Sequence, residues 1–401
     1  MKSLLPVHEA VRRVLDGVVP LESEAVALSQ GIGRVLAEPL LARRSQPPRD
    51  VSAMDGYAVH AADVAALPAE LAVIGTAPAG HPFAGRVGPG EAVRIFTGAV
   101  VPDGADAILL QEDVERLPQQ RIAAREIVAP GQHIRRRGLD FELGAELLPA
   151  GLRLGMRQLA LAAALDHATV PVHRKPLVAI IATGDELVPP GSAGPEDSIV
   201  ASNSYGIAGL VQSLGGDVRD LGIVADDKEK LANAIDAAAG ADILVTLGGA
   251  SVGDHDFAQE VLAARGMELG FWRIAMRPGK PLIYGRLGPM RVLGLPGNPV
   301  SSLVCSLLFL RPLVEAMLGL PSIDHVDSAT LGGPVRANDG RQDYLRADIA
   351  VSADGTRIAT PFDRQDSSML STFAKAGCLI IRPPHAPPAT AGEACSVIIL
   401  P

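Results

Sequence analysis

The stretch L-V-A-I-I-A-T-G-D-E-L, residues 177–187, is an apolar run that ends in a glycine and two acids. A short apolar run bounded by a turn signal is typical of a strand buried on both faces, as in parallel sheets. A helical pattern over residues 207–214 follows, and it stops at Gly215 and Gly216. The order strand, turn, helix predicts the start of a doubly wound α/β domain.

The same order recurs further along the chain. A second strand pattern covers residues 218–224, and Asp227 is placed to cap the helix that comes next. A third strand is predicted at 243–247, and the run V-L-G-L-P-G-N-P-V-S at 292–301 leads into a long apolar helix. We therefore expect the α/β domain to extend over residues 177–320.

Regions outside this domain show three other sequence patterns. Residues 1–45 alternate charged and apolar positions at helical spacing and predict a helical arm, which Q-P-P-R-D at 46–50 breaks. Short apolar runs between Gly, Pro and Asp clusters over residues 57–142 predict a small all-β unit. A helix is expected at 156–165, and a last β-rich module from about residue 330 onward.

Composition narrows the class of protein. The chain has 401 residues, a net charge of −9 and 3% aromatic residues, which argues against a nucleic-acid surface. No apolar run approaches a membrane span, and the first residues lack a signal-peptide pattern, so we expect a cytoplasmic protein that binds neither nucleic acid nor membrane. Three isolated cysteines and nine scattered histidines favour neither a disulfide framework nor a zinc site.

Polar, glycine-rich segments follow each predicted strand of the α/β domain. They cover residues 183–186, 226–227, 248–256 and 296–299. Open parallel sheets bind ligands at the carboxyl ends of their strands, so these four segments are expected to converge on one ligand-binding rim. Taken alone, each segment is better explained as a plain tight turn.

The segment V-T-L-G-G-A-S-V-G-D-H-D-F, residues 245–257, combines a backbone suited to anions with two acids. Its two glycines allow close approach of a ligand, and Ser251 adds a hydroxyl. Asp254 and Asp256 are suited to hold a divalent cation such as Mg2+, which bridges carboxylates to phosphate oxygens. A solvated loop acid or a helix cap is the alternative for either aspartate.

Seven motifs together resemble the MoeA family of molybdopterin molybdenumtransferases. They occur in the order of the family and cover most of the chain. The motifs are M-D-G-Y-A at 54–58, I-F-T-G-A at 95–99, T-G-D-E-L at 183–187, S-N-S-Y at 202–205, G-G-A-S-V-G-D-H-D at 248–256, M-R-P-G-K-P at 276–281 and G-L-P-G-N-P-V-S at 294–301.

The resemblance implies four parts. A helical or elongated linker region takes residues 1–53 and 141–176, and a small β domain takes 54–140. A MogA/MoaB-like α/β domain, similar to molybdopterin adenylyltransferases, takes 177–326, and a C-terminal β-barrel takes 327–401. The sequence leaves open whether the first 26 residues pack on the linker or on the α/β domain.

The resemblance also implies a reaction. Family members insert molybdate into adenylylated molybdopterin with Mg2+ and release AMP to form molybdenum cofactor. They are homodimers whose cleft lies between the α/β domain of one subunit and the small β domain of the other. Docking onto a molybdopterin adenylyltransferase or a molybdoenzyme stays open, as does the choice between molybdate and tungstate.

Residue roles carry over motif by motif. The catalytic candidates are Asp55, Thr97, Asp140, Glu186, Asp226, Asp256 and Lys280. The substrate-binding candidates are Thr183, Gly184, Asp185, Asn203, Ser204, Gly248, Gly249, Ser251, Arg277, Pro296, Gly297, Asn298, Pro299, Ser301, Arg346 and Ser368. The metal candidates are Asp185, Glu186 and Asp256.

The chain departs from the family at three of these places. Arg277 stands where members often have lysine, and a planar guanidinium fork is not equivalent to an ammonium. Leu139 replaces the acid that commonly precedes Asp140. Near Ser367 the usual glycine-serine is replaced by Asp-Ser-Ser, so either Ser367 or Ser368 faces the ligand.

Three other functions remain open from the sequence. The α/β domain alone is compatible with an adenylyltransferase that uses ATP and free molybdopterin. A non-catalytic scaffold is a second alternative, although its expected loss of acids is not observed here. A plain nucleotide-binding regulator is the third, and it predicts nucleotide affinity without molybdate-dependent turnover.

Overall fold

The computed structural model describes residues 4–248 and 257–400. The chain forms two compact units. The first contains Met1–Glu24, Gly33–Ala37 and Val172–Pro401, and the second contains Ala25–Ile32 and Glu38–Pro171.

A six-stranded sheet is the centre of the first unit. Its strand order is β16-β13-β17-β21-β20-β18, in which the first four strands run parallel and the last two antiparallel. The bounds are β13 (Leu177–Thr183), β16 (Asp217–Val224), β17 (Ile243–Leu247), β18 (Glu268–Trp272), β20 (Ile283–Leu287) and β21 (Met290–Leu295). The three predicted strands of this domain are confirmed, and so is the parallel sheet.

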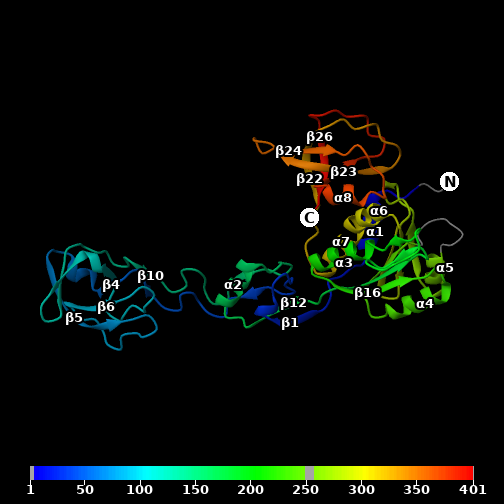
Figure 1. Cartoon of the computed structure of the whole chain (residues 1–401). Helices are drawn as coiled ribbons and strands as arrows, with labels where there is room; N and C mark the ends of the chain where they lie inside the picture. The colour runs from blue at the N-terminus through cyan, green and yellow to red at the C-terminus, as the bar shows by residue number, and fades with distance from the viewer. Residues whose placement is uncertain (1–3, 249–256, 401) are drawn as a thin grey trace. The chain divides into compact units, whose positions relative to one another are not determined.

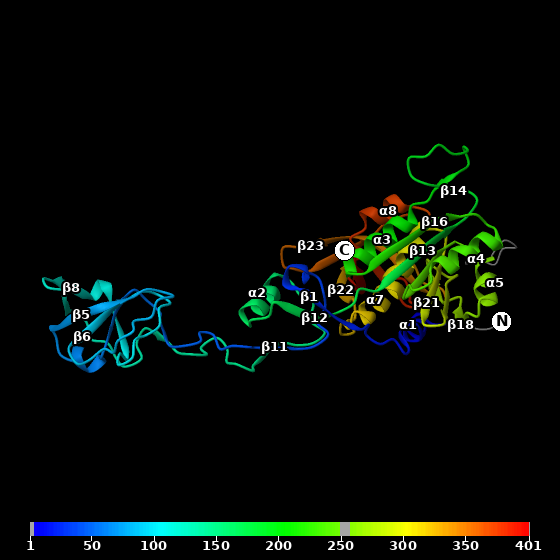
Figure 2. The same cartoon turned by 90° about the horizontal axis from the view of Figure 1, so that it is seen from below.

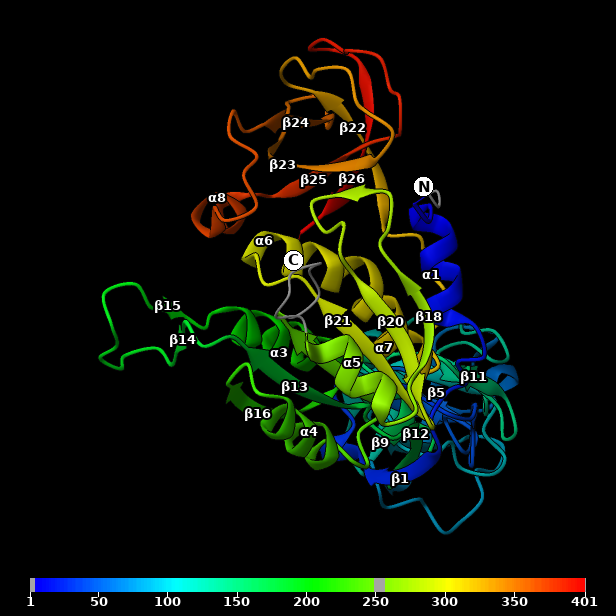
Figure 3. The same cartoon turned by 90° about the vertical axis from the view of Figure 1, so that its right-hand side faces the viewer.

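Helices cover both faces of this sheet (Figure 3). Ile180 and Val245 pack on one face with α3 (Asn203–Leu214), and Ile181 packs on the other face with α4 (Lys228–Ala237). α5 (Phe257–Ala264) joins the α4 side. This alternation along one strand is why β13 has no polar position before Thr183.

One apolar helical segment, Pro299–Met317, is long enough to cross a membrane by length and composition. It consists of α6 (Pro299–Cys305), a π-helical turn (Ser306–Leu310) and α7 (Arg311–Met317). Most of it is buried against the sheet, on the same face as α3. The segment is therefore a core helix of this unit, and its apolar composition reflects burial on nearly all sides.

The prediction of a helical arm over residues 1–45 is only partly right. The helix α1 spans Val7–Leu15, and its buried face belongs to the core of the α/β domain. Gly17 has a positive φ of 61° and Pro20 lacks a backbone donor, so the helix does not continue. The rest of the segment contains β1 (Ser23–Ala27), a 3-10 turn (Leu28–Gln30) and β2 (Leu40–Leu41).

Five strands near the C-terminus close into a barrel (Figure 1). β23 pairs with both β24 and β25, which completes the circle β23-β24-β22-β26-β25. The bounds are β22 (Val326–Leu331), β23 (Gln342–Val351), β24 (Arg357–Pro361), β25 (Cys378–Arg382) and β26 (Ala394–Ile399). Tyr344 and Leu379 face out of the barrel into the α/β core, so the two parts share apolar packing.

The second unit contains the predicted all-β domain, a curled six-stranded sheet in the order β7-β4-β6-β5-β9-β8 (Figure 2). The bounds are β4 (Gly56–Val59), β5 (Ala69–Ala77), β6 (Glu91–Ile95), β7 (Ala107–Leu110), β8 (Val114–Leu117) and β9 (Arg121–Ala124). The helix α2 (Met156–Ala164) lies at the predicted place. Apolar clusters on both faces of the sheet hold the domain together.

The remaining short elements connect these parts. They are β3 (Val51–Ser52), the 3-10 turns Ala61–Val64 and Gln111–Asp113, β10 (Ile134–Arg135), β11 (Glu146–Leu148), β12 (Thr169–His173), β14 (Leu187–Val188), β15 (Ile199–Val200), β19 (Met276–Arg277) and α8 (Leu370–Lys375).

The predicted cap of α4 gives a test of this fold. The Asp227 carboxylate accepts a hydrogen bond from the Lys230 amide at 2.8 Å. We expect Asp227→Ala to lower the free energy of unfolding by about 1 kcal/mol, because a helix-end amide loses its acceptor. Urea unfolding followed by circular dichroism measures the change. Glu229→Ala, an exposed change on the same turn, is the control, and an equal loss in both variants contradicts the assignment.

Candidate functional site

The carboxyl ends of β13, β17 and β21 meet at one edge of the sheet, as predicted. The Thr183 hydroxyl donates to the Leu247 carbonyl at 3.3 Å, and the Gly248 amide donates to the Leu295 carbonyl at 3.2 Å. Gly248 has a φ of 93°, and a Cβ at this position would lie 2.6 Å from the Thr183 carbonyl oxygen. Only glycine fits here, and it brings two strand ends into direct contact.

Two acids lie on the turn that follows β13. The Asp226 amide donates to Oδ1 of Asp185 at 3.0 Å, so the ends of β13 and β16 are joined. The Glu186 carboxylate lies beside Gly184, whose φ is 148° and whose added Cβ would be 2.6 Å from Oε2 of Glu186. Both Asp185 and Glu186 are exposed. The turn therefore presents two carboxylates to solvent at the rim.

The first turns of α3 and α6 complete this rim. The Asn203 side-chain amide donates to the Gly297 carbonyl at 2.8 Å, which ties the start of α3 to the turn before α6. Ser204 and Ser301, one on each helix, are 7% and 4% exposed. Of the turn itself, Gly297 and Asn298 are exposed, whereas the flanking Pro296 and Pro299 are more buried. Helix amino ends and a glycine turn provide backbone amides suited to anions.

Part of the predicted rim lies outside the described residues. Gly249, Ser251, Asp254 and Asp256 all fall in the segment 249–256. Among residues 4–248 and 257–400, no group of three or more His, Cys, Asp or Glu side chains gathers closely enough to hold a metal ion. The predicted metal set thus has two described members, Asp185 and Glu186.

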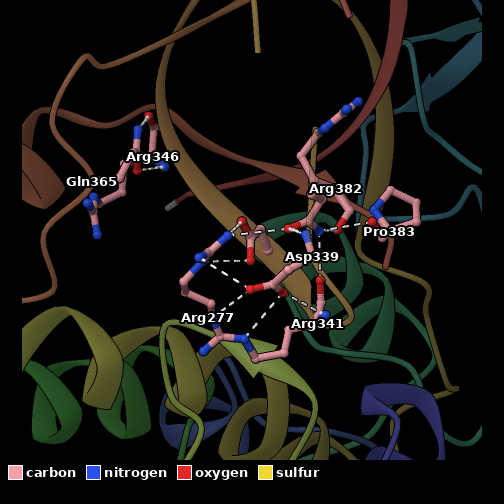
Figure 4. A network of polar contacts seen from close by, with 9 residues as sticks. Arg277, Asp339, Arg341, Arg346, Gln365, Arg382 and Pro383 are labelled. Carbon is pink, nitrogen blue, oxygen red and sulfur yellow. Dashed lines mark hydrogen bonds and ion pairs between the residues drawn. The ribbon is translucent and has the colours of Figure 1, made fainter. Parts of the chain in front are cut away.

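The two cations of the M-R-P-G-K-P loop, Arg277 and Lys280, lie in different environments. Lys280 is exposed, whereas the Arg277 guanidinium is bound to Asp343 on β23 through Nε and a terminal nitrogen. Figure 4 shows Arg277 within a network that also includes Asp339 and Arg341. Asp343 raises the pKa of Arg277 through this hydrogen bond. The predicted anion-binding role of Arg277 therefore competes with an ion pair that the sequence did not reveal.

Arg346 is a buried cation whose guanidinium has no hydrogen-bond partner in the described part of the chain. Its side chain is fully buried, and none of its three guanidinium nitrogens has a hydrogen-bond acceptor among the described residues. Burial lowers the pKa of Arg346, and the charge of Asp366 partly opposes this. A buried charge left unpaired costs about 3–5 kcal/mol, so the site is suited to an oxyanion.

The segment after β24 joins Arg346 to the rim. The Gln365 side chain bonds both the amide and the carbonyl of Arg346 at 2.9 Å, as Figure 4 shows. Two residues on, the Ser367 carbonyl accepts from the Val300 amide at 3.1 Å, at the first turn of α6. The Ser368 hydroxyl donates to Asp366 at 2.6 Å and, with the Ser368 amide, lowers the pKa of that carboxyl.

In the second unit, Asp55 and Thr97 are directly bonded. Oδ1 of Asp55 accepts from the Thr97 amide at 2.7 Å and from its hydroxyl at 2.8 Å. These two bonds, the amide bond first, lower the pKa of Asp55, which therefore stays ionised at neutral pH. The motifs M-D-G-Y-A and I-F-T-G-A thus form one site, although Asp55 and Thr97 are 42 residues apart in the sequence.

Arg94 supports this pair and was missed by sequence reasoning. Its guanidinium lies 5.2 Å from the ring centre of Tyr57 and 4.9 Å from that of Phe96, and it donates to the Gly56 carbonyl at 3.0 Å. Asp140 is exposed, and no hydrogen bond in residues 4–248 and 257–400 joins it to Asp55 or Thr97. The pairing of Asp140 with this site therefore stays a prediction.

Three residues that sequence reasoning missed have partners far away in the sequence. Arg94 bonds Gly56, which is 38 residues away, and Asp343 bonds Arg277, which is 66 residues away. Asn338 accepts from the same Arg277 across 61 residues. A single chain gives no signal for such pairs, because they form only when distant strands and loops pack together.

Three regions of the chain match family descriptions. Residues 5–165 match the MoeA N-terminal region (domain I and II), residues 179–316 match a probable molybdopterin binding domain, and residues 328–400 match the MoeA C-terminal region (domain IV).

Similar proteins extend over nearly the whole chain. The molybdopterin molybdenumtransferase of Haemophilus influenzae is 34% identical over 98% of both chains. That of Bacillus subtilis is 34% identical over 94% of this chain and 90% of the relative. A solved molybdopterin biosynthesis moeA protein from Pyrococcus horikosii has a TM-score of 0.88 and 33% identity, and the match covers 99% of each chain.

The unpartnered Arg346 gives a test of anion binding. We expect molybdate at about ten times its Kd to raise the free energy of unfolding by roughly 1.4 kcal/mol. Arg346→Met removes the buried charge and keeps the volume, so we expect it to be as stable as the wild type without oxyanion. It should gain little from molybdate. Urea unfolding with and without molybdate measures both, Arg346→Lys is the charge-retaining control, and equal stabilisation of Arg346→Met contradicts the assignment.

Proposed function

The chain belongs to the MoeA family of molybdopterin molybdenumtransferases, and from this premise we propose how its residues carry out the family reaction. The reaction inserts molybdate into adenylylated molybdopterin and releases AMP. The observation that carries the proposal is Arg346, a fully buried guanidinium whose nitrogens have no hydrogen-bond partner in residues 4–248 and 257–400. A tetrahedral dianion supplies the charge and the acceptors that such a cation lacks.

Molybdate has further donors near Arg346. The Val300–Ser367 bond brings the segment with Ser368 next to α6, which carries Ser301. Lys280 provides a solvent-exposed ammonium on the neighbouring loop. We assign Ser301, Ser368, Lys280 and Arg346 to the oxyanion, since hydroxyl and cationic donors together satisfy a dianion.

The substrate phosphates fit the glycine-lined rim. Gly248 and Gly184 adopt φ values of 93° and 148°, which let the backbone approach a ligand without a side chain in between. Asn203 fixes the Gly297 carbonyl, so the turn before α6 keeps its shape. We assign the phosphoanhydride of the substrate to this rim.

The donor set at the rim fits Mg2+. Asp185 and Glu186 are exposed carboxylates on one turn, and Mg2+ commonly takes one or two carboxylates together with substrate phosphates. The Asp226 amide bonds Oδ1 of Asp185, and Oδ2 accepts no hydrogen bond in residues 4–248 and 257–400. When bound, the cation would neutralise charge that develops on the phosphates. Asp256 is the third assigned ligand and lies outside the described residues.

The reaction itself gives the first test of this proposal. We expect purified wild-type chain to release AMP from adenylylated molybdopterin with Mg2+ only when molybdate is present. Glu186→Gln and Asp256→Asn should each lose on the order of a hundredfold in rate, because charge neutralisation at the phosphates is lost. Asp197→Asn changes an exposed acid between β14 and β15 and is the control. Synthesis of adenylylated molybdopterin from ATP and free molybdopterin would instead support the adenylyltransferase.

Subunit sharing gives a second test. We propose a homodimer in which Asp55 and Thr97 of one subunit act with the rim of the other. Asp55→Asn and Glu186→Gln should then each be inactive alone. Mixing them after exchange of subunits should restore about a quarter of the wild-type rate, since half of the dimers contain one intact site. No recovery in a mixture that native mass spectrometry, with one variant isotopically labelled, shows to contain mixed dimers contradicts the sharing of the site.

A further inference from the structure

The two cations of the M-R-P-G-K-P loop differ in what they contact. Nε of Arg277 donates to Oδ1 of Asp343 at 2.9 Å, and a terminal nitrogen donates to Oδ2. The same terminal nitrogen reaches Oδ1 of Asn338 at 3.3 Å. Lys280 makes no ion pair or side-chain hydrogen bond in residues 4–248 and 257–400. Arg277 is thus engaged by protein acceptors, whereas Lys280 is available to a ligand.

The acceptor is more buried than the donor. The Asp343 side chain is 8% exposed and that of Arg277 is 48% exposed. A buried carboxylate that loses its cation is strongly unfavourable, so Asp343 holds Arg277 against competition from a bound anion. Two parallel bonds between the guanidinium and the carboxylate add direction to this attraction.

The ion pair lies at a junction of two domains. β19, at the start of the loop, pairs in parallel with β23 of the barrel, and Arg277 lies directly opposite Asp343. Asn338 is itself oriented, because its amide nitrogen donates to the carbonyls of Arg341, Arg382 and Pro383 at 2.7–2.9 Å. The barrel therefore presents a fixed acceptor set to the loop (Figure 4).

The other end of the loop is packed against α6. A Cβ at Gly279 would lie 2.4 Å from Sγ of Cys305, and Gly279 has a φ of 104°. The Ile274 amide bonds the Lys280 carbonyl at 3.0 Å. With Arg277 held at one end and Gly279 at the other, the backbone position of Lys280 has little freedom.

We propose that Asp343 is a positioning residue, which clamps Arg277 and thereby sets Lys280 as the loop cation that binds the oxyanion. The inference rests on the proposed function for the identity of the anion. It assigns Arg277 a role different from that of an anion ligand, although the residue lies in a motif expected to bind substrate. A guanidinium suits this role, because a lysine at position 277 makes only a single-point contact with Asp343.

Calorimetric titration with molybdate separates the two roles of Arg277, because they predict opposite signs. If Asp343 positions the loop, Asp343→Asn weakens molybdate binding on the order of tenfold. The double variant Arg277→Gln/Asp343→Asn then binds no more weakly than either single variant, since no buried charge is left unpaired. If Arg277 is itself a ligand, Asp343→Asn frees the cation and tightens binding, which overturns the proposal.

Controls keep the test decisive. Asp339→Asn changes an acid that lies 3.7 Å from Arg277 and is 48% exposed, so we expect less than about a threefold effect. Arg277→Lys keeps the charge but loses the two-bond contact of the guanidinium with Asp343. If Asp343→Asn does not fold, Arg277→Lys replaces it, and we expect the same weakening of molybdate binding. In the AMP-release assay, Asp343→Asn should raise KM for molybdate and leave kcat within about twofold.

The titration also distinguishes failure of the clamp from failure of the proposed function. Binding is measured without turnover, so the expected pattern in a wild-type chain that releases no AMP supports the clamp and refutes the transferase. Normal AMP release with tighter or unchanged molybdate binding in Asp343→Asn refutes only the clamp. A wild type that binds no molybdate overturns both.

Discussion

The parallel pairing of β13 with β17 and of β17 with β21 is the constraint on which the site depends. Parallel strands end at one edge, so Thr183, Gly248 and Gly297 arrive together although they span more than 100 residues of sequence. The Gly248 amide bonds the end of β21, and a Cβ at Gly248 would lie 2.6 Å from the Thr183 carbonyl oxygen at the end of β13, so this contact has no space for a side chain. The first turns of α3 and α6 lie at the same edge of the sheet and complete the rim.

Packing of the barrel adds charge to this edge in two different ways. Asp343 is buried and pairs with the half-exposed Arg277, so its charge is compensated within the protein. Arg346 is buried without an acceptor among the described residues, so its charge awaits compensation. Both side chains come from β23, the barrel strand that packs against the α/β domain. One strand thus supplies an ion pair that fixes a loop and a cation that is suited to a ligand.

Local patterns predicted the α/β domain well. The strand at 243–247, the helix end at Gly215 and the cap at Asp227 are all confirmed, because each depends on residues that are neighbours in sequence. The helical arm was wrong beyond Leu15, since alternating polar and apolar residues also suit short strands and turns. Asp55 and Thr97 were expected as site residues from two motifs, and the structure adds that they are hydrogen-bonded to each other.

The sequence by itself determined the order of strands and helices in the α/β domain and the rim at the strand ends. These follow from hydrophobic period, turn residues and the geometry of parallel sheets, which are local rules. Only the tertiary structure decided that Arg277 pairs with Asp343 and that Arg346 is buried alone. The charge that a side chain meets depends on which distant elements pack around it, and no spacing along one chain specifies that contact.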